Sequence, residues 1–217
     1  MGLRAVIFDI GGVVTASPMA GFREYEARAG LPDRFVSEVI VAGEDDSAWS
    51  RLERGELSWA EFCERFEAEC AERGETVDAR ELFAAMRSGT DEPGPRPAMV
   101  TAIRRIRARG LRTAALTNNF RLDDPTVEPG TVTRGALAYE EFDLVVESSV
   151  EGLRKPDPRI YLLVCERLEV EPHEAAFLDD LGVNLKAARA LGMTTIKVDD
   201  PAVALAELEA VLGFALT

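Results

Sequence analysis

The sequence lacks the features that would suit a membrane protein, a secreted protein or a nucleic-acid-binding protein. It has no apolar run of about 18 residues or more, so we expect no membrane span. Its first residues show no charged leader followed by an apolar stretch and a cleavage site, so we expect no secretory signal. Acidic residues outnumber basic ones by 39 to 25, and the net charge of −14 argues against nonspecific binding to nucleic acid or to a membrane surface.

Cysteine and histidine are also scarce. Cys63, Cys70 and Cys165 form no CxxC pair, so we expect buried, reduced thiols in a cytoplasmic protein. The single histidine, His173, lies before a predicted strand, and we expect it on the surface, away from the ligand-binding edge of the sheet. What the chain does have is 217 residues, 47% of them apolar, which is enough for one good core and a smaller appendage.

The order of the apolar patterns predicts a sheet that is interrupted early by helices. Residues 3–8 (LRAVIF) are typical of a buried strand, which ends at Asp9. Residues 19–87 carry apolar residues at three- and four-residue spacing, with Ser58 as a suitable N-cap, and predict an all-helical block. Residues 88–99 are rich in proline and glycine and predict a linker.

After this linker, predicted strands alternate with predicted helices. We expect strands at 111–117, 142–148, 175–179 and 193–198, and helices at 97–109, 158–168, 183–191 and from 201 onward, with a polar loop at 119–138. Such alternation gives a parallel sheet that is covered on both faces. The sequence therefore predicts an α/β fold: a Rossmann-like, doubly wound parallel sheet with an all-α block inserted after the first strand.

The residues with the most useful chemistry follow the predicted strands. They are Asp9 after the first strand, Thr117 and Asn118 at the end of the second, Asp179 with Asp180 at the end of the fourth, and Lys155 in the loop GLRKPDP. Because the carboxyl ends of parallel strands share one edge of a sheet, where ligands bind, we expect these groups to converge.

This set of groups suits a phosphate and a divalent cation. Clustered carboxylates need a cation, and oxygen ligands of this kind suit Mg²⁺, which keeps positions free for a phosphate. An ionised Asp9 can attack phosphorus, Lys155 can neutralise negative charge, and Thr117 with the following amide can hold phosphoryl oxygens. Gly11 and Gly12 let the backbone turn sharply, so that its amides face the anion.

Each of these features alone also has an ordinary structural interpretation. An aspartate after a strand often starts a turn, and Asp179 with Asp180 would suit the cap of the following helix. The chain has other Asp-Asp pairs, of which the pair at 199–200 precedes a proline and fits helix capping well. Lys155 differs, because the chain holds only three lysines beside 22 arginines. Turns and helix caps do not readily explain all four features in this order. The features are the acid after the first strand, Thr117 with Asn118 after the second, Lys155 in its loop, and the acid pair after the fourth strand.

Four stretches of the sequence resemble the motifs of the haloacid dehalogenase (HAD) superfamily, most of whose members are Mg²⁺-dependent phosphatases. They are VIFDIGGVV, LTNN, RKPDPRIY and FLDDLGVNLKAARALGM, and they run through the whole chain. The last two, with their neighbours, look especially like the N-terminal phosphatase domain of soluble epoxide hydrolases. They look still more like the related domain fused to some acyl-CoA dehydrogenase family proteins.

The resemblance implies a role for each matching residue. Asp9 would be the nucleophile that forms an aspartyl-phosphate, and Lys155 would stabilise the negative charge. The other implied residues are Thr117 and Asn118 for the phosphoryl group, Asp9, Gly11 (through its carbonyl) and Asp180 for Mg²⁺, and Asp179 and Asn184 in support of these. Residues 16–90 would form a mobile helical cap that selects a small phosphorylated substrate, and residues 1–15 and 91–217 the HAD-like core.

One position departs from the pattern of the family. Most of its phosphatases carry a second aspartate two residues after the nucleophile, and its side chain protonates the leaving group; here that position is Gly11. Such assistance is typically worth ~10²–10⁴-fold in rate, or about 3–5 kcal/mol. We therefore expect an intact Mg²⁺ site in a slower phosphatase, with cap acids such as Glu24, Glu26 or Asp45 as replacement proton donors.

Two other functions remain open on the sequence alone. A metal-independent 2-haloacid dehalogenase would use the same Asp9 and would suit Gly11, but it would give no task to the pair at 179–180. A non-catalytic module that binds a phosphate ligand would also suit the missing acid. Trp49, Trp59 and Phe62 would line an apolar pocket for a lipid or acyl phosphate or, as their helical spacing favours, form the core of the cap.

Overall fold

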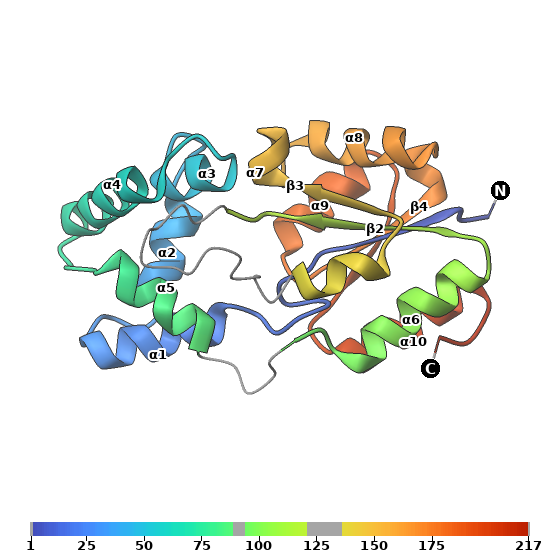
Figure 1. The fold of residues 1–217 in the computed structure, drawn as a ribbon, viewed down its shortest axis with the longest axis horizontal. Helices are drawn as coiled ribbons and strands as arrows, with labels where there is room; N and C mark the ends of the chain where they lie inside the picture. Colours follow the sequence, from blue (N-terminus) through green and yellow to red (C-terminus); the bar gives the residue numbers. More distant parts are fainter. Residues whose placement is uncertain (1, 89–93, 121–135, 217) are drawn as a thin grey trace.

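The computed structural model describes residues 2–88, 94–120 and 136–216, which build a parallel sheet with helices on both faces (Figure 1). The strands are β1 (Ala5–Phe8), β2 (Arg112–Thr117), β3 (Leu144–Glu147), β4 (Ala175–Asp179) and β5 (Thr194–Lys197). Their order in the sheet is β3-β2-β1-β4-β5, and all neighbours run parallel. The first strand of the chain therefore lies in the middle of the sheet.

Two pairs of helices cover the two faces of this sheet. α6 (Pro97–Ala108) and α10 (Pro201–Leu212) cover one face, and α8 (Pro158–Leu168) and α9 (Gly182–Ala190) cover the other. Successive side chains of a strand point to opposite faces, so Val6 and Phe8 pack with the first pair, whereas Ala5 and Ile7 pack with the second. The predicted doubly wound α/β fold is confirmed, and the buried residues of β1 explain its unbroken apolar run.

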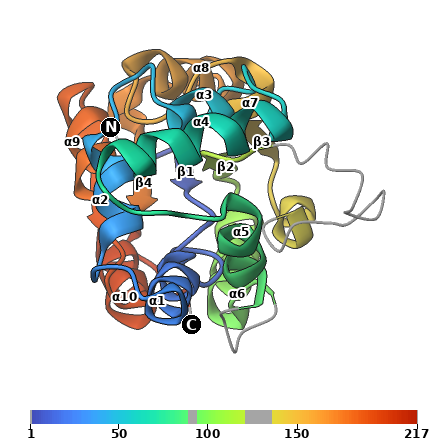
Figure 2. The ribbon, with the colours of Figure 1, turned by 90° about the vertical axis from the view of Figure 1, so that its left-hand side faces the viewer.

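A helical insertion lies between β1 and α6. Its helices are α1 (Met19–Ala29), α2 (Phe35–Ala42), α3 (Ala48–Glu53), α4 (Trp59–Glu72) and α5 (Ala79–Ser88). They pack around a hydrophobic cluster of their own, distinct from the clusters on the two faces of the sheet. The insertion lies beyond the carboxyl ends of the strands, on the left in Figure 1, and Figure 2 looks onto it from that side. The predicted all-helical block is confirmed.

The aromatic residues that raised the question of an apolar pocket lie inside the insertion. Trp49, Trp59 and Phe62 are only 6%, 3% and 0% exposed. The ring of Phe62 lies 5.9 Å from that of Trp49 and 5.5 Å from that of Trp59, and Phe83 packs against all three. The arrangement favours their interpretation as the core of the insertion.

Local signals in the sequence mark the starts of α4, α8 and α10, whereas no such signal marks the end of β3. Ser58 caps α4 in a capping box with Glu61, and Asp157 and Asp200 cap α8 and α10. The strand expected to run to 148 ends at Glu147, and the short helix α7 (Ser148–Glu151) begins there. The loop expected at 119–138 lies mostly outside the described residues, and its last residues enter a 3₁₀ turn at Ala136–Glu141.

The scarce residues are placed as expected. Cys63, Cys70 and Cys165 are buried and form no disulfide. His173 is exposed in a short turn (Pro172–Glu174) before β4, at the opposite end of that strand from Asp179. None of the described helices is both long and apolar enough to cross a membrane.

Candidate active site

Asp9 follows the central strand and lies beside a buried lysine. Its N–H donates to the carbonyl of Leu178 (2.9 Å), which extends the pairing of β1 with β4 by one residue and fixes Asp9 at the edge of the sheet. Lys155 Nζ lies 2.8 Å from Asp9 Oδ1 and 2.8 Å from Asp179 Oδ2. The lysine side chain is only 1% exposed, so its ammonium and these two carboxylates form an ion pair network in the interior. Together with the neighbouring carboxylate of Asp180 we call these groups the ionic cluster.

Burial shifts the protonation of this ionic cluster. Burial, opposed by Lys155 but assisted by the charges of Asp179 and Asp180, raises the pKa of Asp9 to about 7. Burial and Asp179 likewise raise the pKa of Asp180 to about 6. Burial would lower the pKa of Lys155, but Asp179 and Asp9 raise it above its ordinary value, so the lysine stays protonated. Three carboxyl groups share one ammonium, and the cluster is short of positive charge.

The acidic groups of the ionic cluster fit a divalent cation. Asp9, Asp179 and Asp180 each bring one carboxylate oxygen within 4.8 Å of those of the other two. Asp179 is already engaged, because it accepts hydrogen bonds from Lys155 (2.8 Å) and from the side-chain amide of Asn184 (3.0 Å). Asp9 and Asp180 are therefore the carboxylates best placed to ligate an ion, and hard oxygen donors of this kind suit Mg²⁺.

The two glycines after Asp9 meet different constraints. Gly12 has a φ of +83°, and a Cβ there would overlap the carboxylate of Asp180. The backbone thus approaches Asp180 as closely as only glycine allows. A Cβ on Gly11 would meet only Pro18 Cδ, at an ordinary contact distance of 3.8 Å. Packing among the described residues therefore leaves room for a Cβ at position 11, where the family pattern has an acid.

Thr117 and Asn118 lie at the carboxyl end of β2, next to the loop that carries Lys155. Asn118 Oδ1 accepts from the N–H of Lys155 (2.8 Å), and Asn118 Nδ2 donates to the carbonyl of Lys155 (3.0 Å). These two bonds fix the main chain of the lysine that reaches Asp9. The Thr117 hydroxyl makes only a long contact of 3.4 Å with the Asn118 carbonyl, so it is able to turn towards a ligand. Thr117 as a whole is 6% exposed.

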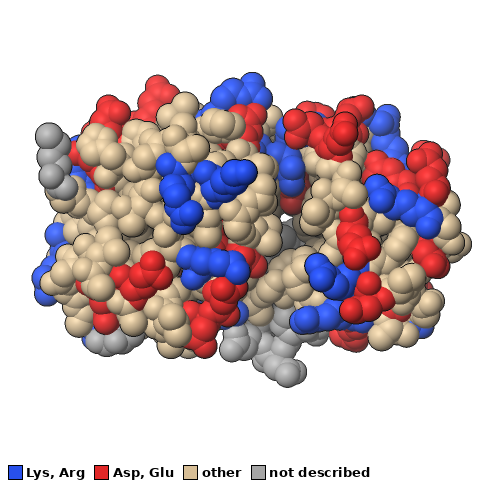
Figure 3. All heavy atoms as spheres, turned by 180° about the vertical axis from the view of Figure 1, so that it is seen from behind, with Lys and Arg blue, Asp and Glu red and all other residues tan. Residues whose placement is uncertain are grey.

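The structure adds Glu53 and Arg154, two residues that sequence reasoning missed. Glu53, at the end of α3, accepts from Arg154 Nε at 2.7 Å and from Asn118 Nδ2 at 3.2 Å. In the view from behind, the surface is hollowed where the insertion meets the sheet (Figure 3). Nothing distinguished Glu53 among the many charges of the helical block, and the one clue to Arg154 was its place before Lys155.

The acids named as replacement proton donors have other surroundings. Glu26 is 2% exposed, and its carboxylate accepts from the N–H groups of Arg34 (3.1 Å) and Val36 (2.8 Å) at the start of α2. Glu24 and Asp45 are exposed on the insertion. The structure thus gives Glu26 a structural task and selects neither of the other two as a proton donor.

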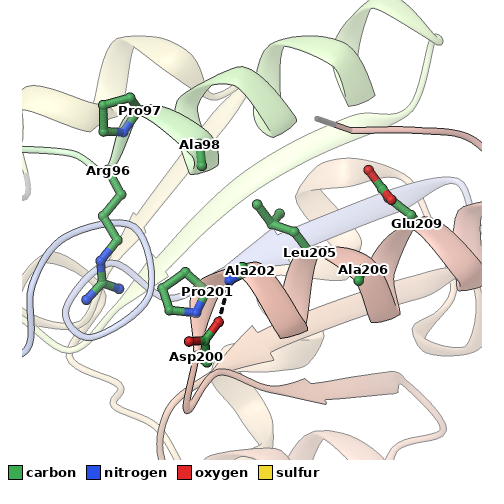
Figure 4. Close-up of a pocket in the computed structure, with 9 residues that line it drawn as sticks. All are labelled: Arg96, Pro97, Ala98, Asp200, Pro201, Ala202, Leu205, Ala206 and Glu209. Atoms are coloured by element: carbon green, nitrogen blue, oxygen red, sulfur yellow. Dashed lines mark hydrogen bonds between the residues drawn. The ribbon is translucent and has the colours of Figure 1, made fainter.

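Arg96 connects the loop after β1 with the chain that returns from the insertion. Its Nη1 donates to the carbonyls of Gly12 (3.0 Å) and Val13 (2.9 Å), and its N–H donates to that of Val14 (2.8 Å). Arg96 also lines a cavity of about 510 Å³ between the starts of α6 and α10 (Figure 4). No residue of the ionic cluster lines this cavity, so it is separate from the candidate site.

Known proteins and a family model match almost the whole chain in sequence. A family model for haloacid dehalogenase-like hydrolases matches residues 3–192. The chain is 42% identical over 214 residues to acyl-CoA dehydrogenase family member 10 of Mus musculus, covering 98% of this chain and 19% of that protein. It is 35% identical over 225 residues to bifunctional epoxide hydrolase 2 of Sus scrofa, covering 100% of this chain and 40% of that protein. The chain thus spans less than half the length of these two relatives.

Other similar proteins match over most of their length. A phosphatase of Mycobacterium tuberculosis is 30% identical over 204 residues, which cover 92% of this chain and 88% of that protein. A HAD family enzyme of Bacteroides thetaiotaomicron, solved with magnesium and inorganic phosphate, has a TM-score of 0.61 at 20% identity, covering 90% and 94% of the two chains. A dehalogenase solved with an intermediate complex has a TM-score of 0.64 at 19% identity, covering 97% of each chain.

The solved structures establish a shared fold, and the family model and the sequence relatives establish the membership that the four motifs indicated. The first, second, third and fourth motifs place Asp9, Thr117, Lys155 and Asp180 at one edge of one sheet. The chain therefore belongs to the haloacid dehalogenase-like hydrolases.

Proposed function

We propose that this chain is a Mg²⁺-dependent phosphomonoesterase that hydrolyses a small phosphorylated metabolite through an aspartyl-phosphate on Asp9. The observation that carries the proposal is the buried ionic cluster, in which Lys155 bridges Asp9 and Asp179 and Asp180 lies beside them. Three carboxyl groups and one ammonium need a further cation, and such a cation would hold the anionic end of a phosphate ester against Asp9.

In this proposal each residue at the edge of the sheet has a chemical task. Asp9 attacks phosphorus, and the bond from phosphorus to the alcohol oxygen breaks as the new bond forms. Lys155 stabilises the negative charge on Asp9 and on the phosphoryl group, and Thr117 with the following amide binds phosphoryl oxygens. Asp9, the carbonyl of Gly11 and Asp180 would hold Mg²⁺, which supplies further neutralisation of the phosphoryl charge. Water then hydrolyses the acyl phosphate and restores Asp9.

The supporting residues act through those that touch substrate. Asn118 fixes the main chain of Lys155, and Asn184 holds the carboxylate of Asp179, which in turn holds the lysine ammonium. Because position 11 is a glycine, no acid from that position protonates the departing alcohol. We therefore infer a slow enzyme whose rate depends strongly on how good the leaving group is.

We further assign residues 16–90 to a helical cap domain and residues 1–15 and 91–217 to the core domain. The separate hydrophobic cluster of the insertion and its place beyond the carboxyl ends of the strands support this division. A phosphate ester as substrate is supported by the relative of M. tuberculosis, which is named a phosphatase. It is also supported by the B. thetaiotaomicron enzyme of the same fold, which holds magnesium and phosphate.

Hydrolysis of p-nitrophenyl phosphate tests the proposal. We expect turnover with Mg²⁺ that is lost on adding EDTA and lost in Asp9→Asn, which keeps the shape but not the charge. Protein quenched in acid during turnover should carry phosphate on the peptide that contains Asp9. Asp200→Asn, which alters the cap of α10, is the matched control and should retain activity. Turnover without metal, or full activity of the Asp9 variant, would contradict the proposal.

A metal-independent 2-haloacid dehalogenase is the second candidate, and Gly11 is the observation that favours it. Displacement of halide at carbon by Asp9 needs no proton donor at position 11. Against it stands Asp180, whose carboxylate lies against Gly12 and would have no cation to bind. Release of halide from 2-chloropropionate without Mg²⁺, together with no hydrolysis of phosphate esters, would reverse the ranking.

A further inference from the structure

The last residue of α3 and the turn after it, residues 53–55, meet the sheet part of the molecule at very short range. A Cβ on Gly55 would lie 2.5 Å from the carbonyl oxygen of Ser149, in α7. The φ of Gly55 is +69°, so the backbone there also adopts a conformation that glycine tolerates best. Main chain packs directly on main chain at this point, and no side chain fits between. We call residues 53–55 the docking turn.

Glu53, the first residue of the docking turn, accepts hydrogen bonds from both parts of the molecule. Its Oε1 accepts from Trp49 Nε1 in its own helix at 3.0 Å. Its Oε2 accepts from Arg154 Nε at 2.7 Å and from Asn118 Nδ2 at 3.2 Å, both in the sheet part. All three partners are donors, so an acceptor with two oxygens is required. A glutamine here would turn its NH₂ group towards a donor.

The contacts of Glu53 lead directly to the ionic cluster. Asn118, which donates to Glu53, also binds the N–H and the carbonyl of Lys155. The Lys155 ammonium in turn contacts Asp9. A second contact between the two parts runs alongside, because the ring of Phe120 packs 4.9 Å from that of Phe83 in the insertion. The insertion is therefore docked on the residues beside the site, rather than on a remote part of the sheet.

We propose that the docking turn holds the helical insertion closed over Asp9, and that Glu53 is a positioning residue that acts through Arg154 and Asn118. The inference rests on the proposed function, since closure matters for catalysis only if the site binds a phosphate ester. Two independent changes should weaken docking. One replaces an acceptor oxygen at position 53, and the other adds a side chain at position 55.

Steady-state kinetics with p-nitrophenyl phosphate test the role of Glu53. When only a fraction of the protein is closed, apparent affinity falls by that fraction, whereas saturating substrate restores closure. We expect Glu53→Gln to raise KM about tenfold or more and to change kcat less than about threefold. Glu64→Gln removes the same charge from an exposed position of α4 in the insertion, away from the docking turn, and it should leave both constants unchanged.

A purely structural role for Glu53 gives a different result. Partial unfolding lowers the concentration of active enzyme, so kcat would fall while KM stayed constant, and that outcome would overturn the proposal. Arg154→Gln should reproduce the rise in KM. The double variant Glu53→Gln with Arg154→Gln should add little to either single change, because the two residues share one interaction.

Hydrogen–deuterium exchange on the metal-free full chain tests docking without reference to activity. Gly55→Ala should speed exchange in residues 49–56 and 148–155. Gly30→Ala is the matched control: its φ of +71° carries the same backbone strain, but nothing lies within 4 Å of its Cβ. Equal exchange of those segments in the two variants would overturn the proposal. If the wild type hydrolyses no phosphate ester and the exchange pattern is as expected, the proposed function fails and the docking turn stands.

Discussion

The ammonium group of Lys155 lies between Asp9 and Asp179, in the interior. Lys155→Met keeps most of the side-chain volume but leaves two buried carboxylates facing each other. Loss of one partner from a buried ion pair typically costs about 3–5 kcal/mol. We expect the free energy of unfolding at neutral pH to fall by about that amount, and turnover to be lost. Urea unfolding followed by circular dichroism measures the change.

Lys186→Met is the matched control for this change. Lys186 is exposed on α9, and substitutions at such positions usually alter stability by less than about 0.5 kcal/mol. A Lys155→Met protein as stable as the wild type would show that the lysine does not hold the two carboxylates together.

Gly11 lies where the proposed reaction lacks a proton donor. Packing does not explain the glycine, because a Cβ at this position would meet no close neighbour. We expect Gly11→Asp to raise kcat for an alkyl phosphate by roughly 10²–10⁴-fold, and to raise it far less for p-nitrophenyl phosphate, whose leaving group needs little protonation. Comparison of kcat for the two esters measures the difference. Gly11→Asn controls for the volume of the side chain and should give no gain.

The same variant separates an enzyme from a phosphate-binding module. If the wild type hydrolyses no ester and Gly11→Asp creates activity, the native task is binding rather than catalysis. If the wild type turns over a phosphate ester well, the binding-only function fails.

At the scale of single helices, Glu26 provides a cap that comes from another element. It lies in α1, yet its carboxylate satisfies two N–H groups at the start of α2. A buried donor left without an acceptor costs about 1–3 kcal/mol, so we expect Glu26→Ala to lower the free energy of unfolding by about 2 kcal/mol. Glu26→Gln, which keeps one acceptor oxygen, should lose less. Chemical denaturation measures both, and a change no larger than that of the exposed Glu24→Ala would contradict this role.

Glu26 also shows which helix caps a sequence can reveal. Ser58, Asp157 and Asp200 cap the helices that they immediately precede, so the residue and its task are neighbours in the chain. Ser58 and the pair at 199–200 were predicted as caps on that basis. Glu26 lies eight residues from Arg34 and in a different helix. Such a cap depends on how two helices pack, so no pattern in the neighbouring sequence predicts it.

The elements of the sheet were predictable for a similar reason. Buried parallel strands appear in the sequence as short apolar runs, and the residues after them reach a common edge of the sheet, so the closeness of Asp9 to Asp180 was predicted from the order of the strands alone. The closeness of Glu53 to Arg154 was not, because it arises only through the packing of the insertion on the sheet. The short helix α7 was missed too, since four residues carry no helical period.

Across the whole molecule, we expect the ionic cluster to link stability to pH and, if the proposed function holds, to Mg²⁺. The pKa of Asp9 is raised to about 7 and that of Asp180 to about 6, so the metal-free folded state holds protons that the unfolded chain releases near pH 4. Stability from these groups is therefore fully present below about pH 4 and is lost as the pH rises from there to about 6 to 7.

In the proposed site Mg²⁺ would bind the ionised carboxylates, so its stabilising effect should have the opposite pH dependence. We expect saturating Mg²⁺ to raise the melting temperature more at about pH 8 than at about pH 5.5. Differential scanning fluorimetry at the two pH values measures the rise. Asp180→Asn should remove most of the difference, whereas a rise independent of pH would mean that the ion binds elsewhere.

The bonds of Arg96 lie where the chain leaves the sheet for the helical insertion and where it returns. They connect residues 12–14, which lead into the insertion, to residue 96, which follows it. The two chain segments that join the insertion to the sheet are therefore held together on the side nearest Asp9. For the proposed cap movement we expect the hinge to lie beyond these bonds, on the side away from Asp9. In the proposed enzyme we therefore expect the groups that hold the ion and the phosphoryl group to keep their positions, and the helical insertion to discriminate between esters by their organic part.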